Sequence, residues 1–339
     1  MERLYTFKEF LNESQSVPQL TQEQIDFLNE SVQRGSWEVT KKGLINVKGH
    51  LKIHQFKGEK FPVKFGTVTK FFNLTDCENL NTLEGFPLVI KSDTNIKGCN
   101  SLTDLRGMSS TIHGILNINR CDSLASLKGS DLKLMAGFDI NNCPALISLE
   151  GSPESCSYFN CSYNKSLKDL KGGPSKVSIY EIRECEGLET LEGAPSTVGK
   201  FSILYCKSLK TLKGGPRRVN IEFSCFSCTS LVDLVGSPES VGGAFNAIGC
   251  YKLKTLKGIS NKIGGSLDCK DCRNLVSLED FPLELGGQFI HVYCPKIDKD
   301  QLDLVDTPEL LRKFFDSGMS MEEFKHQKRG TLKGKEFGF

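Results

Sequence analysis

The sequence predicts a solenoid, a chain that coils into stacked turns around a parallel β-sheet. Three observations support this prediction. A cysteine or asparagine, called the anchor below, recurs every 21 or 22 residues without a gap. Apolar residues lie five and three positions before most anchors, which is the alternation of a short strand with one buried face. Leucines follow at three and six positions after it, and such a fixed period is typical of solenoids, whose units bury their apolar sides by stacking.

The anchor column indicates that the cysteines are packing residues. Ten of the fourteen cysteines occupy it, and a buried free cysteine behaves as a small hydrophobe. We expect the one asparagine, Asn164, to satisfy loop backbone groups at the same corner. A reducing cytosol is therefore the expected environment. The anchors are Cys77, Cys99, Cys121, Cys143, Asn164, Cys185, Cys206, Cys228, Cys250, Cys272 and Cys294.

The second half of each unit carries turn residues. A glycine such as Gly85 follows the second leucine, many units add a proline such as Pro87 two residues later, and many have a valine three residues beyond that. Glycine frees the backbone and proline removes a ladder donor. We therefore expect this half to be an extended, turning return path.

The strand half of the unit resembles the leucine-rich repeat family. The segments FDINNCPAL and FSILYCKSL are similar to its LxLxxN/CxL signature. The resemblance implies a leucine-rich repeat solenoid with a parallel β-sheet on the concave face, and the short period leaves room only for short irregular convex loops. Residues 36 to 297 also resemble bacteriophage proteins that repeat SLEGxPxxVGGxFxCSxC, as in SLEGSPESCSYFNCS and DLVGSPESVGGAFNAIGC.

Helical caps are expected at both ends of the array. Thr21 and Gln24 have the spacing of a capping box, and Ser320 with Glu323 repeats it near the C-terminus. Thr307 and Pro308 open a further helix with a cap residue and proline at the first position. The predicted divisions are a signal-like or flexible segment (1–20), a helix with irregular capping coils (21–70), the array (71–297), and a helical cap and tail (298–339).

The first residues carry a second resemblance. TFKEFLNES is similar to head-targeting signals of internal proteins in large contractile-tailed phages, which a prohead protease cuts after glutamate. The resemblance implies cleavage after Glu13, leaving Ser14 as the new terminus. The alternative is an ordinary amphipathic helix, because Leu4, Phe7 and Phe10 are spaced for one face.

The composition of the chain indicates whether nucleic-acid binding or membrane association is expected. The net charge is only +2 from 43 basic and 41 acidic residues, which gives no reason to expect specific nucleic-acid binding. No apolar run approaches 18 residues and no secretory signal opens the chain, so no membrane association is expected. We expect the host cytoplasm, or the virion interior if the N-terminal resemblance holds.

Two CxxC pairs are candidates for metal or redox chemistry. Cys225 with Cys228, and Cys269 with Cys272, have zinc-like spacing. Both positions of each pair are interior columns of the repeat, and the pairs lie two units apart, so core packing is the favoured interpretation. No cofactor is expected, and a metal- or thiol-dependent enzyme is kept as an unfavoured alternative.

The outward strand positions predict a protein-binding face. Two positions before the anchor, three successive units carry Leu204, Phe226 and Ile248, with Arg183 before them. An apolar row rimmed by polar residues, here Glu181 and Asn246, is a candidate partner site. The alternative is that a cap or a second copy covers the row. The sequence thus predicts a non-enzymatic scaffold of phage origin that binds a host or phage protein, or alternatively a head-packaged virion protein delivered to the host, and it leaves the oligomeric state open.

The N-terminal resemblance yields a direct prediction. If TFKEFLNES is a head-targeting signal, the protein in purified virions begins at Ser14. Mass spectrometry of purified phage particles checks this, with protein from infected cytosol as the control. Absence of the protein from particles, or an intact Met1, would contradict the signal.

Overall fold

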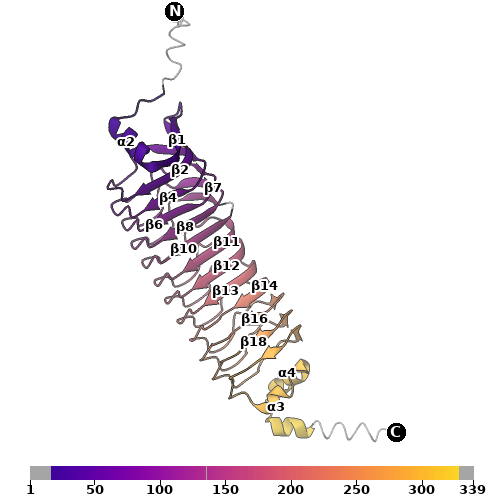
Figure 1. Cartoon of the computed structure of the whole chain (residues 1–339). Helices are drawn as coiled ribbons and strands as arrows, with labels where there is room; N and C mark the ends of the chain where they lie inside the picture. Colours follow the sequence, from indigo (N-terminus) through magenta and orange to yellow (C-terminus); the bar gives the residue numbers. More distant parts are fainter. Residues whose placement is uncertain (1–16, 135, 328–339) are drawn as a thin grey trace, which may run out of the picture. The chain divides into compact units, whose positions relative to one another are not determined.

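The computed structural model describes residues 17–134 and 136–327 of the 339-residue chain (Figure 1). Glu13 and Ser14, the predicted processing residues, lie outside this described part. The chain is a parallel β-solenoid of about eleven turns with few helices. It divides into two compact units, Met1–Leu167 with Lys171–Val177, and Lys168–Leu170 with Ser178–Phe339.

The first unit begins with a helix and a hairpin. Helix α2 (Gln22–Ser31) has the predicted capping box, because the Thr21 side chain accepts a hydrogen bond from the Gln24 amide and the Gln24 side chain accepts one from the Thr21 amide. Strands β1 (Val32–Val39) and β2 (Leu44–His54) pair in antiparallel fashion, and β2 then pairs in parallel with β3 and β4. The sequence had predicted irregular coils here, so the hairpin is a more regular start than expected.

Each turn of the first unit supplies two strand segments, which form two parallel ladders. The segments just before the anchors are β4 (Phe72–Thr75), β6 (Thr94–Lys97), β8 (Ile115–Asn119), β10 (Gly137–Asn141) and the end of β11 (Ser155–Ser162). The earlier segments are β3 (Lys64–Val68), β5 (Val89–Ile90), β7 (Ser109–Ile112) and β9 (Asp131–Leu134). Equivalent residues pair throughout, as in Asn73 with Asn95 and Asn95 with Asn117.

The second unit continues this pattern with shorter strands toward its end. Its strands are β12 (Lys176–Arg183), β13 (Thr197–Leu204), β14 (Arg218–Ser224), β15 (Ser240–Val241), β16 (Phe245–Asn246), β17 (Lys262–Ile263), β18 (Leu267–Asp268), β19 (Glu284–Leu285) and β20 (Phe289–Ile290). In β12 and β13 one strand spans both segments. Helices α3 (Lys299–Leu302) and α4 (Pro308–Ser317) follow, and Ser320 and Glu323 form the predicted capping box before a further helical stretch.

The second ladder is the main difference from the sequence interpretation. The return half was expected to have irregular loops, yet β5, β7, β15 and β17 lie there and pair with their counterparts in the next turn. A branched apolar residue in each segment explains this, since Ile90, Ile112, Val241 and Ile263 point inward and are at most 1% exposed. In the turns of Ile90 and Val241 it lies three residues after a proline, and the turns of Ile112 and Ile263 have no proline there. Proline lies before the strand and therefore removes no ladder donor from it.

The core consists of the columns that the repeat predicted. The anchors and the two leucines after them are buried, as are most residues three and five positions before them. Phe201, Ile203, Cys206 and Leu209, for example, are all 0% exposed. The interior is thus a stack of identical layers, and each turn buries its apolar side against its neighbours.

Two left-handed positions in each turn shape its corners. The residue before every anchor has φ between 52° and 70°, whatever its type. For the ten anchors from Cys77 to Cys272, the position eight residues later has φ between 64° and 99°, and it is glycine after the first nine and Asp280 after the tenth. At Gly107 a Cβ atom would also lie 2.4 Å from the Glu84 amide nitrogen, so this corner requires glycine.

Core and surface positions within one turn should respond differently to truncation. Leu209 is 0% exposed, whereas the Lys210 side chain is 67% exposed and pairs with Glu189 at 2.8 Å. We expect Leu209→Ala to lower the free energy of unfolding by about 2–5 kcal/mol because it opens a cavity. Lys210→Ala should change it by less than about 0.5 kcal/mol. Denaturant unfolding of both variants measures this, and equal effects would contradict the assigned inside and outside.

Candidate partner-binding face

The predicted apolar row forms one line along the second unit. Arg183 pairs in register with Leu204 in the β12–β13 ladder. The Tyr205 amide donates to the Phe226 carbonyl at 2.9 Å, and the Ser227 amide donates to the Ile248 carbonyl at 2.8 Å. The ladder therefore places Arg183, Leu204, Phe226 and Ile248 side by side in successive turns.

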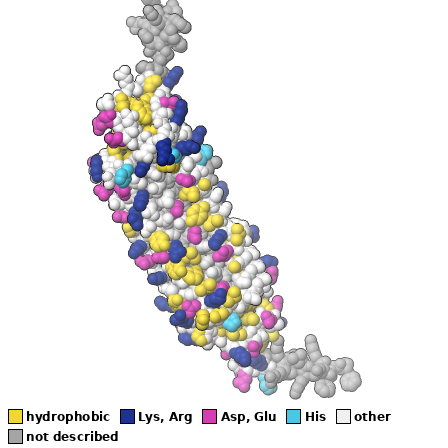
Figure 2. Space-filling view, viewed as in Figure 1, with side chains coloured by type: hydrophobic (Ala, Val, Ile, Leu, Met, Phe, Trp, Pro, Cys, Tyr) yellow, Lys and Arg dark blue, Asp and Glu magenta, His cyan; other side chains and the backbone are white. Residues whose placement is uncertain are grey.

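These four side chains point outward from a closed core. Each is half-buried, while the residue before it in the strand is buried. In the Leu204 turn that inner neighbour is Ile203, which is 0% exposed. Hydrophobic side chains lie at the surface of the molecule among charged ones (Figure 2). The hydrogen bonds of Gln301 in α3 and Arg312 in α4 to the array are made with residues 261–281, which follow the row in the sequence.

An aromatic residue that the sequence analysis missed joins the row. The Tyr205 ring meets the Phe226 ring edge-on with centroids 5.1 Å apart. The guanidinium carbon of Arg183 lies 5.0 Å from the centroid of the Tyr205 ring, and Arg183 also pairs with Glu184 at 3.2 Å. Arg183, Tyr205 and Phe226 therefore form a contiguous cation–π and aromatic cluster.

The backbone explains why Tyr205 turns toward the row. It occupies the left-handed position before the anchor, with φ of 59°. The signal in the sequence was the composition of this column, because Asp76, Gly98, Asn142 and Gly249 are residue types that tolerate left-handed backbone. Recognising that corner would have placed Tyr205 on the outward surface.

The polar residues predicted for the rim lie on the same face in a second row. Glu181 is paired in register with Ser202, and Ser202 with Ser224. Asn246 follows in register with Ser224, and its side-chain oxygen accepts a hydrogen bond from the Ile248 amide at 3.0 Å. The two serines are each 3% exposed, so small side chains separate Glu181 from Asn246.

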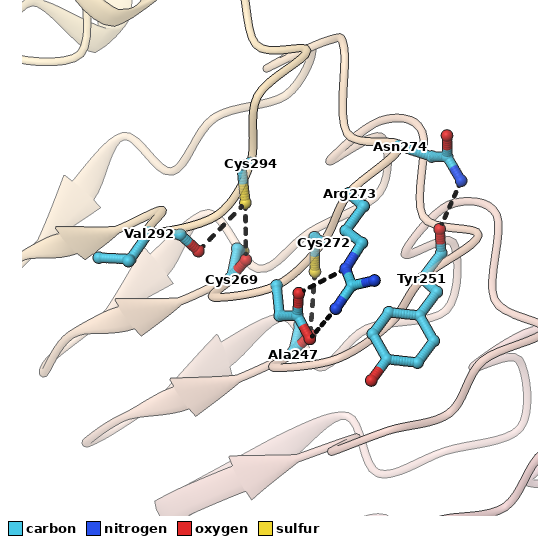
Figure 3. Close-up of polar contacts among 9 residues, drawn as sticks. Ala247, Tyr251, Cys269, Cys272, Arg273, Asn274, Val292 and Cys294 are labelled. Carbon is cyan, nitrogen blue, oxygen red and sulfur yellow. Dashed lines mark hydrogen bonds and ion pairs between the residues drawn. The ribbon is translucent and has the colours of Figure 1, made fainter.

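The CxxC pairs belong to the core. Cys225, Cys228, Cys269 and Cys272 are all 0% exposed. Thiols at the anchors donate to carbonyls of the preceding turn (Figure 3), with Cys272 reaching the Ala247 oxygen at 3.1 Å and Cys294 reaching the Cys269 oxygen at 3.0 Å. Within residues 17–134 and 136–327, no group of three or more His, Cys, Asp or Glu side chains could hold a metal ion.

The surroundings of these thiols suppress their ionisation. A hydrogen bond with the Cys250 thiol, followed by burial, raises the pKa of Cys225 well above its ordinary value. Burial raises the pKa of Cys228, and a hydrogen bond with Cys272 followed by burial raises the pKa of Cys269. Since the thiolate is the nucleophile and the metal ligand, a raised pKa disfavours both roles for Cys225, Cys228 and Cys269.

Asn164 confirms the structural role of the anchor. Its side-chain nitrogen donates to the Ile140 carbonyl at 2.9 Å, and its side-chain oxygen accepts from the Cys143 amide at 2.9 Å. The first contact is equivalent to the thiol-to-carbonyl contacts of Cys272 and Cys294. The anchor position therefore needs a small donor that closes the corner between turns.

Thiol reactivity tests this view of the cysteines. Burial raises the pKa of Cys156 and Cys294 to about 11 from an ordinary 9.0, so at pH 8 only about one in a thousand of these thiols is ionised. A hydrogen bond with a neighbouring thiol lowers the pKa of Cys77 and of Cys143, but both are buried like the other twelve cysteines. We therefore expect the native protein to show no fast reaction with dithionitrobenzoate at pH 8. All fourteen thiols should react after denaturation. Raising the pH to 9 should add no fast phase, because the folded-state pKa of Cys156 and of Cys294, about 11, is still above that pH.

A contrary result would restore the enzyme alternative. A fast-reacting thiol in the native protein, or stoichiometric zinc that is lost in Cys269→Ser, would show that a CxxC pair is functional. Cys206→Ser, at an anchor outside both pairs, is the matched control.

Comparisons with known proteins give no indication of the function of this chain. In the described part of the chain, no helix combines the length and apolar character needed to cross a membrane. No protein-family model, curated protein or solved structure matches the chain.

Proposed function

We propose that the protein is a non-enzymatic scaffold that captures a protein partner on the outward face of the second unit. We further propose that its turns are of the leucine-rich repeat type with helical caps at both ends. The observation that carries the proposal is the outward row of Leu204, Phe226 and Ile248, held in register by turn-to-turn hydrogen bonds. The partner-binding face is defined as this row with Arg183, Tyr205, Glu181 and Asn246.

The chemistry of the face favours a protein partner. Aromatic residues and arginine dominate binding energy in protein interfaces, and the Arg183–Tyr205–Phe226 cluster supplies both. Binding at this row requires little ordering of the backbone, because hydrogen bonds between turns already fix it. Glu181 and Asn246 provide polar groups beside this apolar centre, as in the rim of typical interfaces.

The enzyme alternative has less support. An enzyme at the CxxC pairs would need an accessible thiolate or a bound metal. The four thiols are 0% exposed, and the carbonyls of neighbouring turns already accept their hydrogen bonds at several positions. We therefore propose a binding role without a cofactor.

The place of action follows from two separate arguments. Fourteen buried free thiols are suited to a reducing cytosol, which favours the cytoplasm of an infected host. The alternative, a virion protein delivered to the host, rests only on the resemblance of residues 1–20 to a phage head signal. Binding through the partner-binding face is compatible with either location.

A charge at the centre of the face should abolish capture without unfolding the protein. Phe226 is half-buried and outward, so Phe226→Asp should keep the thermal midpoint within a few degrees. Loss of a central aromatic anchor should weaken partner binding at least about tenfold. The measurement is affinity capture from lysates of infected host cells, followed by quantitative mass spectrometry of the bound proteins.

A matched variant tests whether capture is lost because Phe226 is replaced or because any outward position gains a negative charge. Asn119 occupies the same outward column in the first unit and is also half-buried, so Asn119→Asp should retain capture. A partner that binds wild type and Asn119→Asp but not Phe226→Asp supports the proposal. Equal capture by all three proteins would place the site elsewhere.

A further inference from the structure

The last turn of the array leaves a set of backbone donors without a following turn. Within earlier turns, alternate strand amides donate forward: Phe245 to the Ser266 carbonyl, Ala247 to Asp268 and Gly249 to Lys270, all at 2.8–2.9 Å. The next turn repeats this with Leu267, Cys269 and Asp271, which donate to the carbonyls of residues 288, 290 and 292.

The equivalent donors in the last turn are the amides of Phe289, His291 and Tyr293. No hydrogen bond of these three amides is present among the described residues, because β20 pairs only with β18. Their side of the strand is an open edge, and three N–H groups at two-residue spacing are a template for one more strand.

The sequence of this edge lacks the usual protection against pairing. Natural edge strands are blunted by lysine, by proline or by other charged residues. The segment from Gln288 to Tyr293 reads QFIHVY, with no Lys, Arg, Asp, Glu or Pro, and it is rich in residues that favour strands. Val292 is 49% exposed and Tyr293 is 75% exposed.

A groove runs beside this edge. Its volume is about 600 Å³. One wall is formed by Leu285 and Phe289 of the last two strands, and the other by Leu302, Val305 and Pro308 of the C-terminal cap. Apolar side chains thus face each other across the groove, but more of its exposed lining is polar than apolar, and Gln288, His291 and Asp306 also line it.

The cap is held on the other half of the turn. The Leu278 amide donates to the Gln301 side-chain oxygen at 2.9 Å, and the Gln301 side chain donates to the Val276 carbonyl at 3.2 Å. Arg312 of α4 donates to the Phe281 carbonyl at 3.3 Å. These contacts cover the return path, and none of them uses the amides of Phe289, His291 or Tyr293.

We propose that this edge and groove bind an extended peptide segment of another polypeptide, which adds to β20 as a parallel strand. The three forward-facing amides supply the backbone hydrogen bonds, and the groove takes alternate apolar side chains of the segment. An uncharged segment with apolar residues at every second position fits this chemistry. A second solenoid edge fits less well, because the cap forms the opposite wall and each copy would bring its own cap. This site is separate from the partner-binding face.

A peptide taken from the array itself is a suitable probe. Residues 243–249, GAFNAIG, already serve as such a strand within the protein. Their carbonyls at Ala244, Asn246 and Ile248 accept hydrogen bonds from Phe223, Cys225 and Ser227 of the preceding turn at 2.8–3.0 Å. We expect fluorescein-labelled GAFNAIG to bind the full-length protein saturably in an anisotropy titration, and a scrambled peptide not to bind.

Proline at the edge tests the role of the backbone. His291→Pro removes one forward donor, and an outward-facing N–H of an edge strand is where proline is tolerated. His291→Ala removes the same side chain and keeps the N–H, so it is the matched control. Peptide affinity should fall about threefold to tenfold more in His291→Pro than in His291→Ala, the range expected for one hydrogen bond. Leu302→Glu should also weaken binding, because it charges the opposite wall without altering the strand.

The other outcomes would overturn the proposal. Absence of saturable peptide binding, or equal affinity in all variants with unchanged thermal midpoints, would show that the edge is not a peptide site. A concentration-dependent doubling of mass in sedimentation equilibrium, lost in His291→Pro, would assign the edge to self-association instead. Binding that occurs only after removal of residues 328–339 would assign the groove to the chain's own C-terminal segment.

Discussion

The hydrogen bonds between successive turns are the constraint on which the rest of this structure depends. Strand amides before the anchors donate to carbonyls 20 or 21 residues later in the following turn, as with the Tyr205 amide and the Phe226 carbonyl. This pairing holds only if every turn has the same corners. The left-handed residue before each anchor and the glycine eight residues after it supply them. A uniform register then follows, and equivalent side chains become neighbours in space.

That register gives the inward and outward columns different roles. Inward columns must fill a layer of constant size, so the anchor is a cysteine or the similarly small Asn164, which makes the same type of contact with a carbonyl of the preceding turn. The thiols are used for packing, and their pKa values are raised by burial or by a neighbouring thiol at several positions. Side chains in the outward columns do not have to fit a layer of constant size. The row of Leu204, Phe226 and Ile248 departs from the polar residues found in the same column of the first unit, and packing does not require it.

Much of this architecture is predictable from the sequence because the interior is periodic. The anchors, the buried leucines and the capping box at Thr21 and Gln24 all follow from spacing alone. The second ladder was not predicted, since glycine and proline dominate that half of the unit and its strands β5, β15 and β17 are only two residues long. Tyr205 was not predicted because strand alternation assigns no face to the residue before the anchor, and it is the left-handed backbone there that turns the ring onto the face. The repeat spacing identifies the row of Leu204, Phe226 and Ile248. It cannot identify the ligand, because binding also depends on the surface of the partner.

Amide hydrogen exchange tests the stacking account most directly. The account assigns Phe245, Ala247 and Gly249 to bonds with a following turn and leaves the equivalent Phe289, His291 and Tyr293 as open donors. Measured residue by residue at neutral pH, the first three amides should be protected and the last three should exchange rapidly, although the two sets occupy equivalent positions of the repeat. Equal protection of the two sets would contradict the open edge, and rapid exchange of both would contradict the ladder itself.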